Sequence, residues 1–215
     1  MRSMISNPYE YYSQKAGAQI FEHSFQQQLN WWYVNAKTSG INASLMGAIL
    51  NQLLAIQSYH SKVIVIRIDL RLASGVDECE REAYTEGNKL VTIFNRRFHK
   101  WLRRQYGFKR IGFFWCREHE KAKSQHYHYA LMLDGSKVGY PKRINEKAIS
   151  IWGNLSGSCY IPKTPFYTIQ RDDDESRQSA IWRLSYLAKK RGKGYKKAQT
   201  KNYGASRIKP KPNNA

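Results

Sequence analysis

The sequence predicts a fold of class α+β, in which an antiparallel strand pair and a further charged strand accompany amphipathic helices. Residues 110–134 contain two apolar runs joined by a short polar segment, as in a β-hairpin. Residues 63–72, VIVIRIDLRL, alternate apolar and charged side chains in their second half, which is typical of a strand with one buried face. The stretches around these strands carry apolar residues at helical spacing.

The predicted hairpin carries the candidate metal ligands. Side chains alternate faces along a strand, so His126 and His128 point the same way. If residues 121–125 form the loop, Glu118 lies roughly opposite His128 on the same face, whereas a slip of one residue would move it to the other face. Two imidazoles and a carboxylate can hold a divalent metal and leave positions open for substrate. Taken alone, the pair also fits two half-buried histidines with backbone partners.

The composition favours a polyanionic partner. The 215 residues suffice for one domain with an extension, and 36 lysines and arginines against 16 acidic residues give a net charge of +20. Charge alone does not separate DNA, RNA and acidic membrane. No apolar run reaches the length of about 18 residues that spans a bilayer, and the first residues lack the apolar core of a signal peptide. Cys79, Cys116 and Cys159 are too widely spaced for a disulfide framework or a zinc knuckle, so we expect a cytoplasmic location.

We expect a helical extension over residues 1–60, a main domain over residues 61–207 and a disordered basic tail over residues 208–215. Helical spacing predicts one helix over residues 18–37 and a second over residues 43–59. The stripe of the first consists of Phe21, Phe25, Leu29 and Trp32. The stripe of the second consists of Leu45, Ile49, Leu53 and Ile56.

In the main domain, the strand over residues 63–72 has one apolar face and one face with Arg67, Asp69 and Arg71. This charged face either meets solvent or lines the metal site. A long helical stretch is predicted from Ser74 to Tyr106, with acidic first turns and basic last turns that complement the helix dipole. A further helix is predicted after Pro141, and a short strand over residues 166–170.

The last predicted helix follows the acidic run of residues 172–175, which suits a helix N-terminus. Its apolar stripe is formed by Ala180, Ile181, Leu184, Leu187 and Ala188. Tyr186 projects away from this stripe beside Arg183, Lys189 and Lys190, where it could meet a phosphate or simply lie on the surface. From Ser176 onward the chain has no acidic residue, so we expect the part after residue 192 to be a flexible basic arm for a nucleic-acid backbone.

The order of these elements resembles the rolling-circle replication initiators and relaxases of the HUH endonuclease superfamily. HYH, residues 126–128, matches the two-histidine motif, and YLAK, residues 186–189, matches the tyrosine motif of initiators with a single nucleophile. Over residues 63–207, the segments WCRE, HYHYALMLDG, SYLAKK and YGASR look more specifically like the YagK/YfjJ domain family. That family is associated with filamentous-phage (inovirus) replication proteins and integrated elements.

The resemblance implies a central antiparallel sheet flanked by helices and an enzyme that nicks and rejoins single-stranded DNA. Glu118, His126 and His128 would hold Mg²⁺ or Mn²⁺, Tyr186 would form a covalent phosphotyrosine, and Lys189 would support it. The basic residues expected to contact DNA are Arg67, Arg71, Arg183, Lys190, Arg191 and Arg207. The implied partners are a replication origin and a host replication helicase in the bacterial cytoplasm, with no membrane.

Two other functions fit the same residues. One is a non-catalytic DNA-binding regulator on the same fold, and the other is a metal-dependent phosphodiesterase that uses water. A covalent protein–DNA adduct separates both from the nicking and joining enzyme. Tyr195 and Tyr203 are less suited to be the nucleophile, because the first follows a glycine-rich segment and the second belongs to YGASR.

Overall fold

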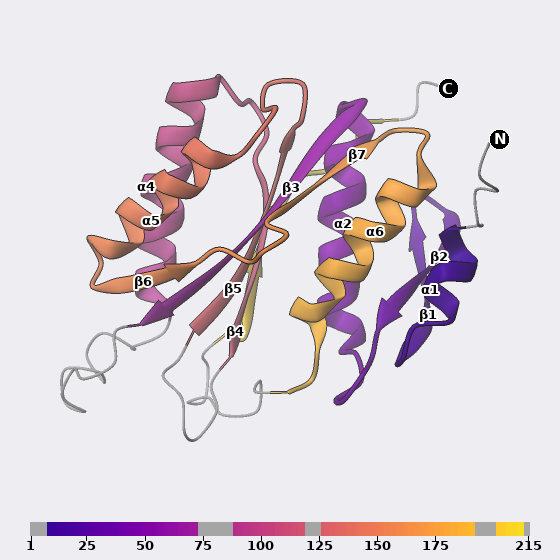
Figure 1. Ribbon diagram of the computed structural model, residues 1–215. Coiled ribbons are helices and arrows are strands. Elements are labelled where there is room, and N and C mark those ends of the chain that lie inside the picture. Colours follow the sequence, from indigo (N-terminus) through magenta and orange to yellow (C-terminus); the bar gives the residue numbers. More distant parts are fainter. Residues whose placement is uncertain (1–7, 73–87, 119–125, 192–200, 213–215) are drawn as a thin grey trace, which may run out of the picture.

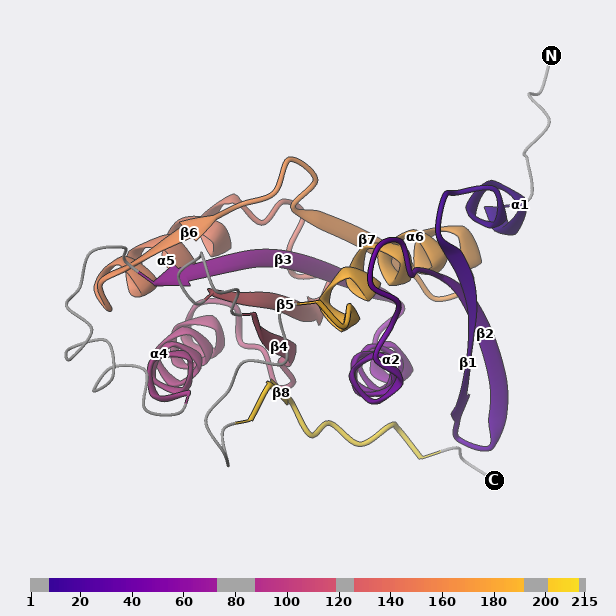
Figure 2. The same ribbon diagram turned by 90° about the horizontal axis from the view of Figure 1, so that it is seen from below.

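The computed structural model describes residues 8–72, 88–118, 126–191 and 201–212. It confirms the α+β class, with antiparallel sheets flanked by helices (Figure 1). The central sheet has six strands in the order β6–β3–β5–β4–β8, and β7 also pairs with β3. A separate two-stranded sheet, β1–β2, lies outside the helices on one side (Figure 2).

The central sheet is built on two long strands from the predicted segments. Its strands are β3 (Lys62–Leu72), β4 (Gly112–Glu118), β5 (His126–Asp134), β6 (Gly157–Tyr160), β7 (Phe166–Gln170) and β8 (Tyr203–Ala205). β5 pairs with β3 on one side and with β4 on the other, and every pair in the sheet is antiparallel. β6 and β7 pair with successive halves of the same edge of β3, and the chain between them is free of ladder pairing.

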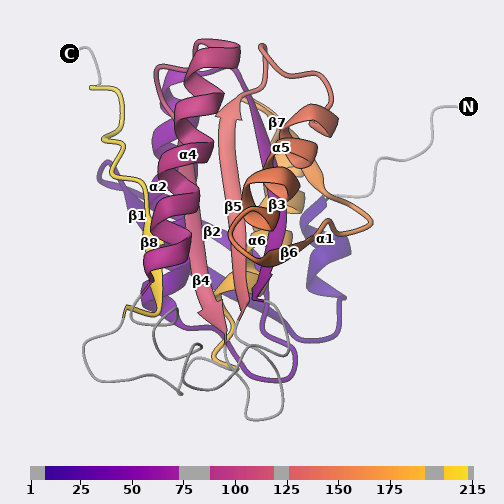
Figure 3. The ribbon, with the colours of Figure 1, turned by 90° about the vertical axis from the view of Figure 1, so that its left-hand side faces the viewer.

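Helices cover both faces of this sheet, and each face has its own apolar core. α4 (Lys89–Tyr106) and α5 (Lys142–Gly153) lie on one face (Figure 3), where they pack on the even-numbered apolar residues of β3, such as Ile64 and Ile66. α2 (Ala43–Tyr59) and α6 (Asp174–Leu184) lie on the other face, over Val63 and Val65. The period of two in a strand sends alternate residues into the two cores.

The predicted helix over residues 18–37 is wrong. The chain there forms β1 (Ala18–Phe25) and β2 (Gln28–Asn35), joined by Gln26 and Gln27, which both have positive φ angles as in a two-residue hairpin turn. Phe21 and Phe25 are four residues apart, a spacing that fits one face of a strand as well as one face of a helix. Residues 8–60 are therefore a mixed segment, in which a short helix α1 (Pro8–Ser13) and α2 flank a β-hairpin.

Residues 203–212 do not form the flexible arm that the sequence suggests. β8 pairs with β4 at the edge of the sheet, and the following segment runs along that edge (Figure 3). Gln52 of α2 accepts hydrogen bonds from the hydroxyl of Ser206 and the N–H of Ile208, and Ser58 accepts one from the N–H of Lys211. The expectation of a disordered tail is thus wrong for residues 208–211, because polar side chains of α2 satisfy its backbone.

The other predicted elements are confirmed in the described residues, with one change in the segment that contains Tyr186. α2, α5 and β7 lie where the sequence places them, and the first turns of the long stretch from Ser74 fall outside the described residues. The side chain of Asp173 caps α6 by accepting a hydrogen bond from the N–H of Ser176. α6 ends at Leu184 and continues as a single 3₁₀ turn, η1 (Ser185–Ala188), instead of an α-helix to residue 192. Within the described residues, no helix is long and apolar enough to cross a bilayer.

A buried histidine in the core under α4 predicts a specific pH dependence of stability. Nε2 of His99 and the hydroxyl of Tyr129 share a hydrogen bond at a distance of 2.9 Å. Burial, and to a smaller extent Arg103, lower the pKa of His99 to about 4. In the unfolded chain this imidazole takes up a proton at about pH 6.5, so the folded state binds fewer protons between these two pH values.

We therefore expect stability to fall as the pH drops from about 7 to about 4.5, with His99 contributing a loss of about 2 kcal/mol. His99→Gln keeps an acceptor for Tyr129 and does not titrate, so this part of the slope should disappear. Urea unfolding of both proteins at several pH values measures it. If the free energy of unfolding changes with pH by the same amount in both proteins, His99 is not the cause of the pH dependence.

Candidate metal centre and active site

The candidate site lies at one end of the sheet, where three neighbouring strands change from apolar to polar side chains on the same face. On β3 this face passes from Val65 to Arg67, Asp69 and Arg71. On β5 it carries His126 and His128 before the apolar residues begin, and on β4 it ends at Glu118. α2 and α6 cover the apolar part of the face, so the polar ends open into a cavity.

The register brings the three predicted ligands to one face. Glu118 pairs with His126, and Cys116 pairs with His128. The expected pairing of Glu118 with His128 is therefore off by two residues. Such a shift preserves the face on which each side chain lies, since side chains alternate with a period of two. The prediction that Glu118, His126 and His128 converge is confirmed.

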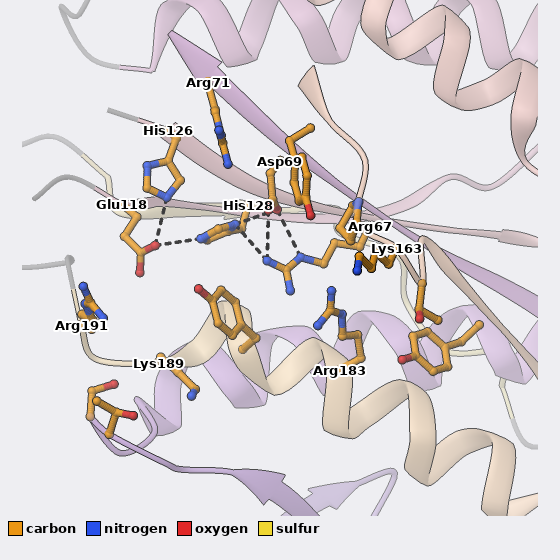
Figure 4. Close-up of a pocket in the computed structure, with 17 residues that line it drawn as sticks. Arg67, Asp69, Arg71, Glu118, His126, His128, Lys163, Arg183, Lys189 and Arg191 are labelled. Atoms are coloured by element: carbon orange, nitrogen blue, oxygen red, sulfur yellow. Dashed lines mark hydrogen bonds and ion pairs between the residues drawn. The ribbon is translucent and has the colours of Figure 1, made fainter. Parts of the chain in front are cut away.

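The geometry of the three ligand atoms fits a bound metal ion. Oε2 of Glu118 lies 3.1 Å from Nε2 of His126 and 2.8 Å from Nε2 of His128 (Figure 4). One ligand atom from each residue lies within 4.8 Å of the others. Neighbouring ligands of an octahedral ion with bonds of about 2.1 Å lie about 3 Å apart. The group could therefore hold a metal ion through mixed nitrogen and oxygen donors.

Asp69 orients His128, a role that the sequence left unassigned. Oδ1 of Asp69 lies 2.7 Å from Nδ1 of His128, directly across the β3–β5 ladder. A proton held at Nδ1 leaves Nε2 as the atom that can bind a metal. Asp69 also accepts two hydrogen bonds of 3.2 Å from the guanidinium of Arg67. The sequence places Asp69 between Arg67 and Arg71 on the polar face of β3, but only the pairing with β5 brings it to His128.

The surroundings of Asp69 and His128 favour an ionised carboxylate next to a protonated imidazole. Burial by itself lowers the pKa of His128, but its hydrogen bonds to Asp69 and Glu118 outweigh burial and raise the pKa above its ordinary value. Burial raises the pKa of Asp69, but the hydrogen bond from His128 and the charge of Arg67 outweigh it, so this pKa is lowered. A metal ion bound at Nε2 would take the place of the proton there, so the two compete for His128.

Tyr186 stands over this group and is held by the N-terminal part of the chain. The centroid of its ring lies 5.2 Å from that of His128, in an edge-to-face arrangement. The N–H of Asn42 donates a hydrogen bond to the carbonyl of Ala188, and Ser185 accepts one from the N–H of Asn35. These contacts fix the 3₁₀ turn on the core side and leave Tyr186 facing the cavity.

Two cations lie over the ring of Tyr186. The guanidinium carbon of Arg67 is 4.4 Å from the ring centroid, and Nζ of Lys189 is 5.4 Å away. Lys189 follows the 3₁₀ turn in an extended conformation, so the expectation that it lies one α-helical turn beyond Tyr186 is wrong. Its ammonium also donates a hydrogen bond to the carbonyl of Lys37. Arg67 is therefore the nearer of the two cations.

The cavity in front of the sheet has a volume of about 1210 Å³ and is strongly cationic. Four of the six basic residues predicted to contact DNA line it, namely Arg67, Arg71, Arg183 and Arg191. Lys190 and Arg207 do not line it, and Arg207 follows β8 at the far edge of the sheet. The structure adds residues that the sequence did not single out, chiefly Tyr160, Lys163, Thr164 and Tyr167. These come from β6, β7 and their connection, whose pairing with β3 had no local sequence signal.

A family model for the YagK/YfjJ C-terminal domain matches residues 26–155, more than half of the chain. The chain belongs to this family. Members of the YagK/YfjJ family are uncharacterised proteins, so the match assigns no reaction. The matched region starts earlier than residue 63 and stops before residue 207, so it includes Glu118, His126 and His128 but not Tyr186. No curated protein matches the chain.

The triad predicts a single Mn²⁺ site in this YagK/YfjJ domain. Replacing Glu118 by Gln removes the anionic ligand, and replacing His128 by Gln removes an imidazole, so each change should abolish measurable Mn²⁺ binding in calorimetric titration. His60→Gln, at the opposite end of the β3–β5 pair, serves as the control and should bind Mn²⁺ like the parent protein. Full Mn²⁺ binding by Glu118→Gln would remove Glu118 from the ligand set.

The Asp69–His128 contact predicts a positioning effect on the same measurement. Asp69→Asn weakens the hydrogen bond that holds the proton at Nδ1 of His128, so Mn²⁺ affinity should fall about 10- to 100-fold while the fold is retained. Asp134→Asn on the same pair of strands is the matched control. Equal affinities of the two variants would contradict the role of Asp69.

Proposed function

We propose that this protein nicks and rejoins single-stranded DNA through a covalent phosphotyrosine at Tyr186, as a member of the HUH superfamily. The observation that carries the proposal is the position of Tyr186, whose ring centroid lies 5.2 Å from that of His128, beside the Glu118–His126–His128 group. The two motifs come from distant parts of the chain. Their meeting in one cationic cavity supports a shared reaction on a phosphodiester.

The proposed reaction exchanges one phosphoester bond for another. The phenolic oxygen of Tyr186 attacks the phosphorus and loses its proton, and the bond from phosphorus to the 3′ oxygen breaks. The leaving oxygen takes up a proton and becomes a free 3′-hydroxyl, while the 5′ side stays on Tyr186. Attack by a 3′-hydroxyl reverses these steps and rejoins the strand, so no nucleotide cofactor is consumed. A divalent ion bound by Glu118, His126 and His128 would neutralise the non-bridging oxygens of the phosphate.

The surroundings of Tyr186 support its role as the nucleophile. A neutral phenol is a weak nucleophile, and nearby cations stabilise its ionised form. Arg67 lies against the ring, and its two hydrogen bonds to Asp69 fix its direction. Lys189 approaches the same ring, which agrees with the role expected for it. The contacts of Ala188 and Ser185 with the N-terminal segment hold the turn in place, and such positioning accounts for much of the catalysis of bond exchange.

The cationic cavity and the net charge of +20 favour a polyanionic substrate. We expect this substrate to be single-stranded DNA at a replication origin, with a host replication helicase as a further partner in the bacterial cytoplasm. These expectations follow from the resemblance of the HYH and YLAK motifs to those of rolling-circle initiators.

The adduct test separates the proposal from its alternatives. With Mn²⁺ and single-stranded oligonucleotides, the parent protein should form a covalent adduct that survives a denaturing gel. Tyr186→Phe removes one oxygen and should form none, while its DNA binding and fold are retained. Tyr195→Phe and Tyr203→Phe are the matched controls and should form the adduct.

Other outcomes identify the other functions. Cleavage by Tyr186→Phe without an adduct would indicate a phosphodiesterase that uses water. DNA binding by the parent protein with neither cleavage nor adduct, on oligonucleotides that cover its own replicon, would indicate a non-catalytic regulator.

A further inference from the structure

The cavity extends beyond the metal ligands to a second cationic end. Glu118 and His126 lie at one end, and Arg183 and Lys163 lie at the other, with Arg67, Asp69 and His128 between them (Figure 4). Arg183 projects from α6, and Lys163 belongs to the connection between β6 and β7. The two cations thus come from different layers of the fold and converge on one space.

The β6–β7 connection is built to reach into the cavity. Pro162 and Pro165 flank Lys163 and Thr164, and proline lacks the N–H needed for ladder pairing. The ladder with β3 is interrupted there, and the carbonyl of Pro165 accepts a hydrogen bond from the N–H of Arg67. The intervening residues therefore leave the sheet and line the cavity next to Arg67.

The charge at this end is not balanced within the described part of the chain. The two carboxylates that line the cavity are Glu118, beside the histidines, and Asp69, which is bonded to Arg67 and His128. None of the described carboxylates forms an ion pair with Arg183, and its Nε is buried without a hydrogen-bond partner among the described residues. Burial and the charge of Arg67 both lower the pKa of Arg183. The guanidinium of Arg183 lines the cavity without a described carboxylate to balance its charge, which favours an anionic ligand at this end.

The geometry points to a second phosphate subsite at Arg183 and Lys163, which binds the phosphodiester next to the one held at the metal centre. This inference rests on the proposed function and specifies its substrate: a strand with at least two consecutive phosphodiesters inside the cavity. The planar guanidinium suits the oxygens of a phosphate, and Lys163 adds a point charge. The ring of Tyr167, which also lines this end, offers an apolar surface for the nucleoside between the two phosphates.

The test compares two short probes on a protein that cannot form the adduct. The full chain with Tyr186→Phe is loaded with Mn²⁺, and thymidine dinucleotide and trinucleotide, with one and two phosphodiesters, compete against a fluorescent oligothymidylate. We expect the second phosphodiester to increase affinity about tenfold, in line with a charge-assisted hydrogen bond. A trinucleotide with one neutral methylphosphonate linkage should bind like the dinucleotide.

Arg183→Gln should remove the gain from the second phosphodiester and leave dinucleotide binding within about twofold. Arg104→Gln, an exposed arginine of α4 on the opposite face of the sheet, removes the same charge and should retain the gain. A retained gain in Arg183→Gln would overturn the subsite, as would an equal loss for both probes. Circular dichroism checks folding. If Arg183→Gln does not fold, Lys163→Ala and the methylphosphonate trinucleotide take its place in the test. The inference is overturned if the methylphosphonate trinucleotide binds as tightly as the unmodified trinucleotide.

The subsite and the proposed reaction fail separately. Binding that depends on Arg183 and the second phosphodiester, together with the absence of any Tyr186 adduct in the parent protein, leaves the subsite standing and removes the nicking reaction. A Tyr186 adduct in the parent protein, together with binding that does not depend on Arg183 or on the second phosphodiester, supports the nicking reaction and removes the subsite.

Discussion

The pairing of β3 with β5 is the constraint on which the site depends. It places Asp69 directly opposite His128, so that a carboxylate on one strand holds the proton of an imidazole on the next. The pairing of β5 with β4 then adds Glu118 on the same face. Because side chains alternate along each strand, a slip of a single residue in either ladder would send a ligand into the core under α4 and α5. The apolar residues farther along the same strands oppose such a slip.

The turn that carries Tyr186 lies outside the matched family region, but contacts with β2 and the start of α2, which lie inside that region, hold it in place. α6 and the 3₁₀ turn after it are anchored to β2 and to the start of α2 by backbone contacts at Asn35 and Asn42. The hairpin β1–β2 and α1 pack on the outside of α6 (Figure 2). The N-terminal segment is therefore a support for the turn that carries Tyr186 rather than a separate appendage.

The charges around the cavity are distributed in a way that suits a phosphodiester. Negative charge is confined to Asp69 and Glu118, which are occupied by Arg67 and the two histidines. The remaining charged groups that line the cavity are cations from β3, the β6–β7 connection, α6 and the segment after the 3₁₀ turn. Such a field favours the polyanionic substrate that we propose.

The sequence by itself determined the strands over residues 63–72, 112–118 and 126–134, the helices α2, α5 and the start of α6, and the convergence of Glu118 with the two histidines. Those features depend on the spacing of apolar and polar residues along each segment, which can be read directly from the sequence. It misassigned residues 18–37, because a spacing of four residues fits both a helix and a strand. It misjudged residues 203–211, because β4 and α2, which are far away in the sequence, supply hydrogen-bond partners for them. The role of Asp69, the approach of Arg67 to Tyr186 and the position of Lys163 were decided by the tertiary structure alone, since each depends on a contact between strands or layers far apart in the chain.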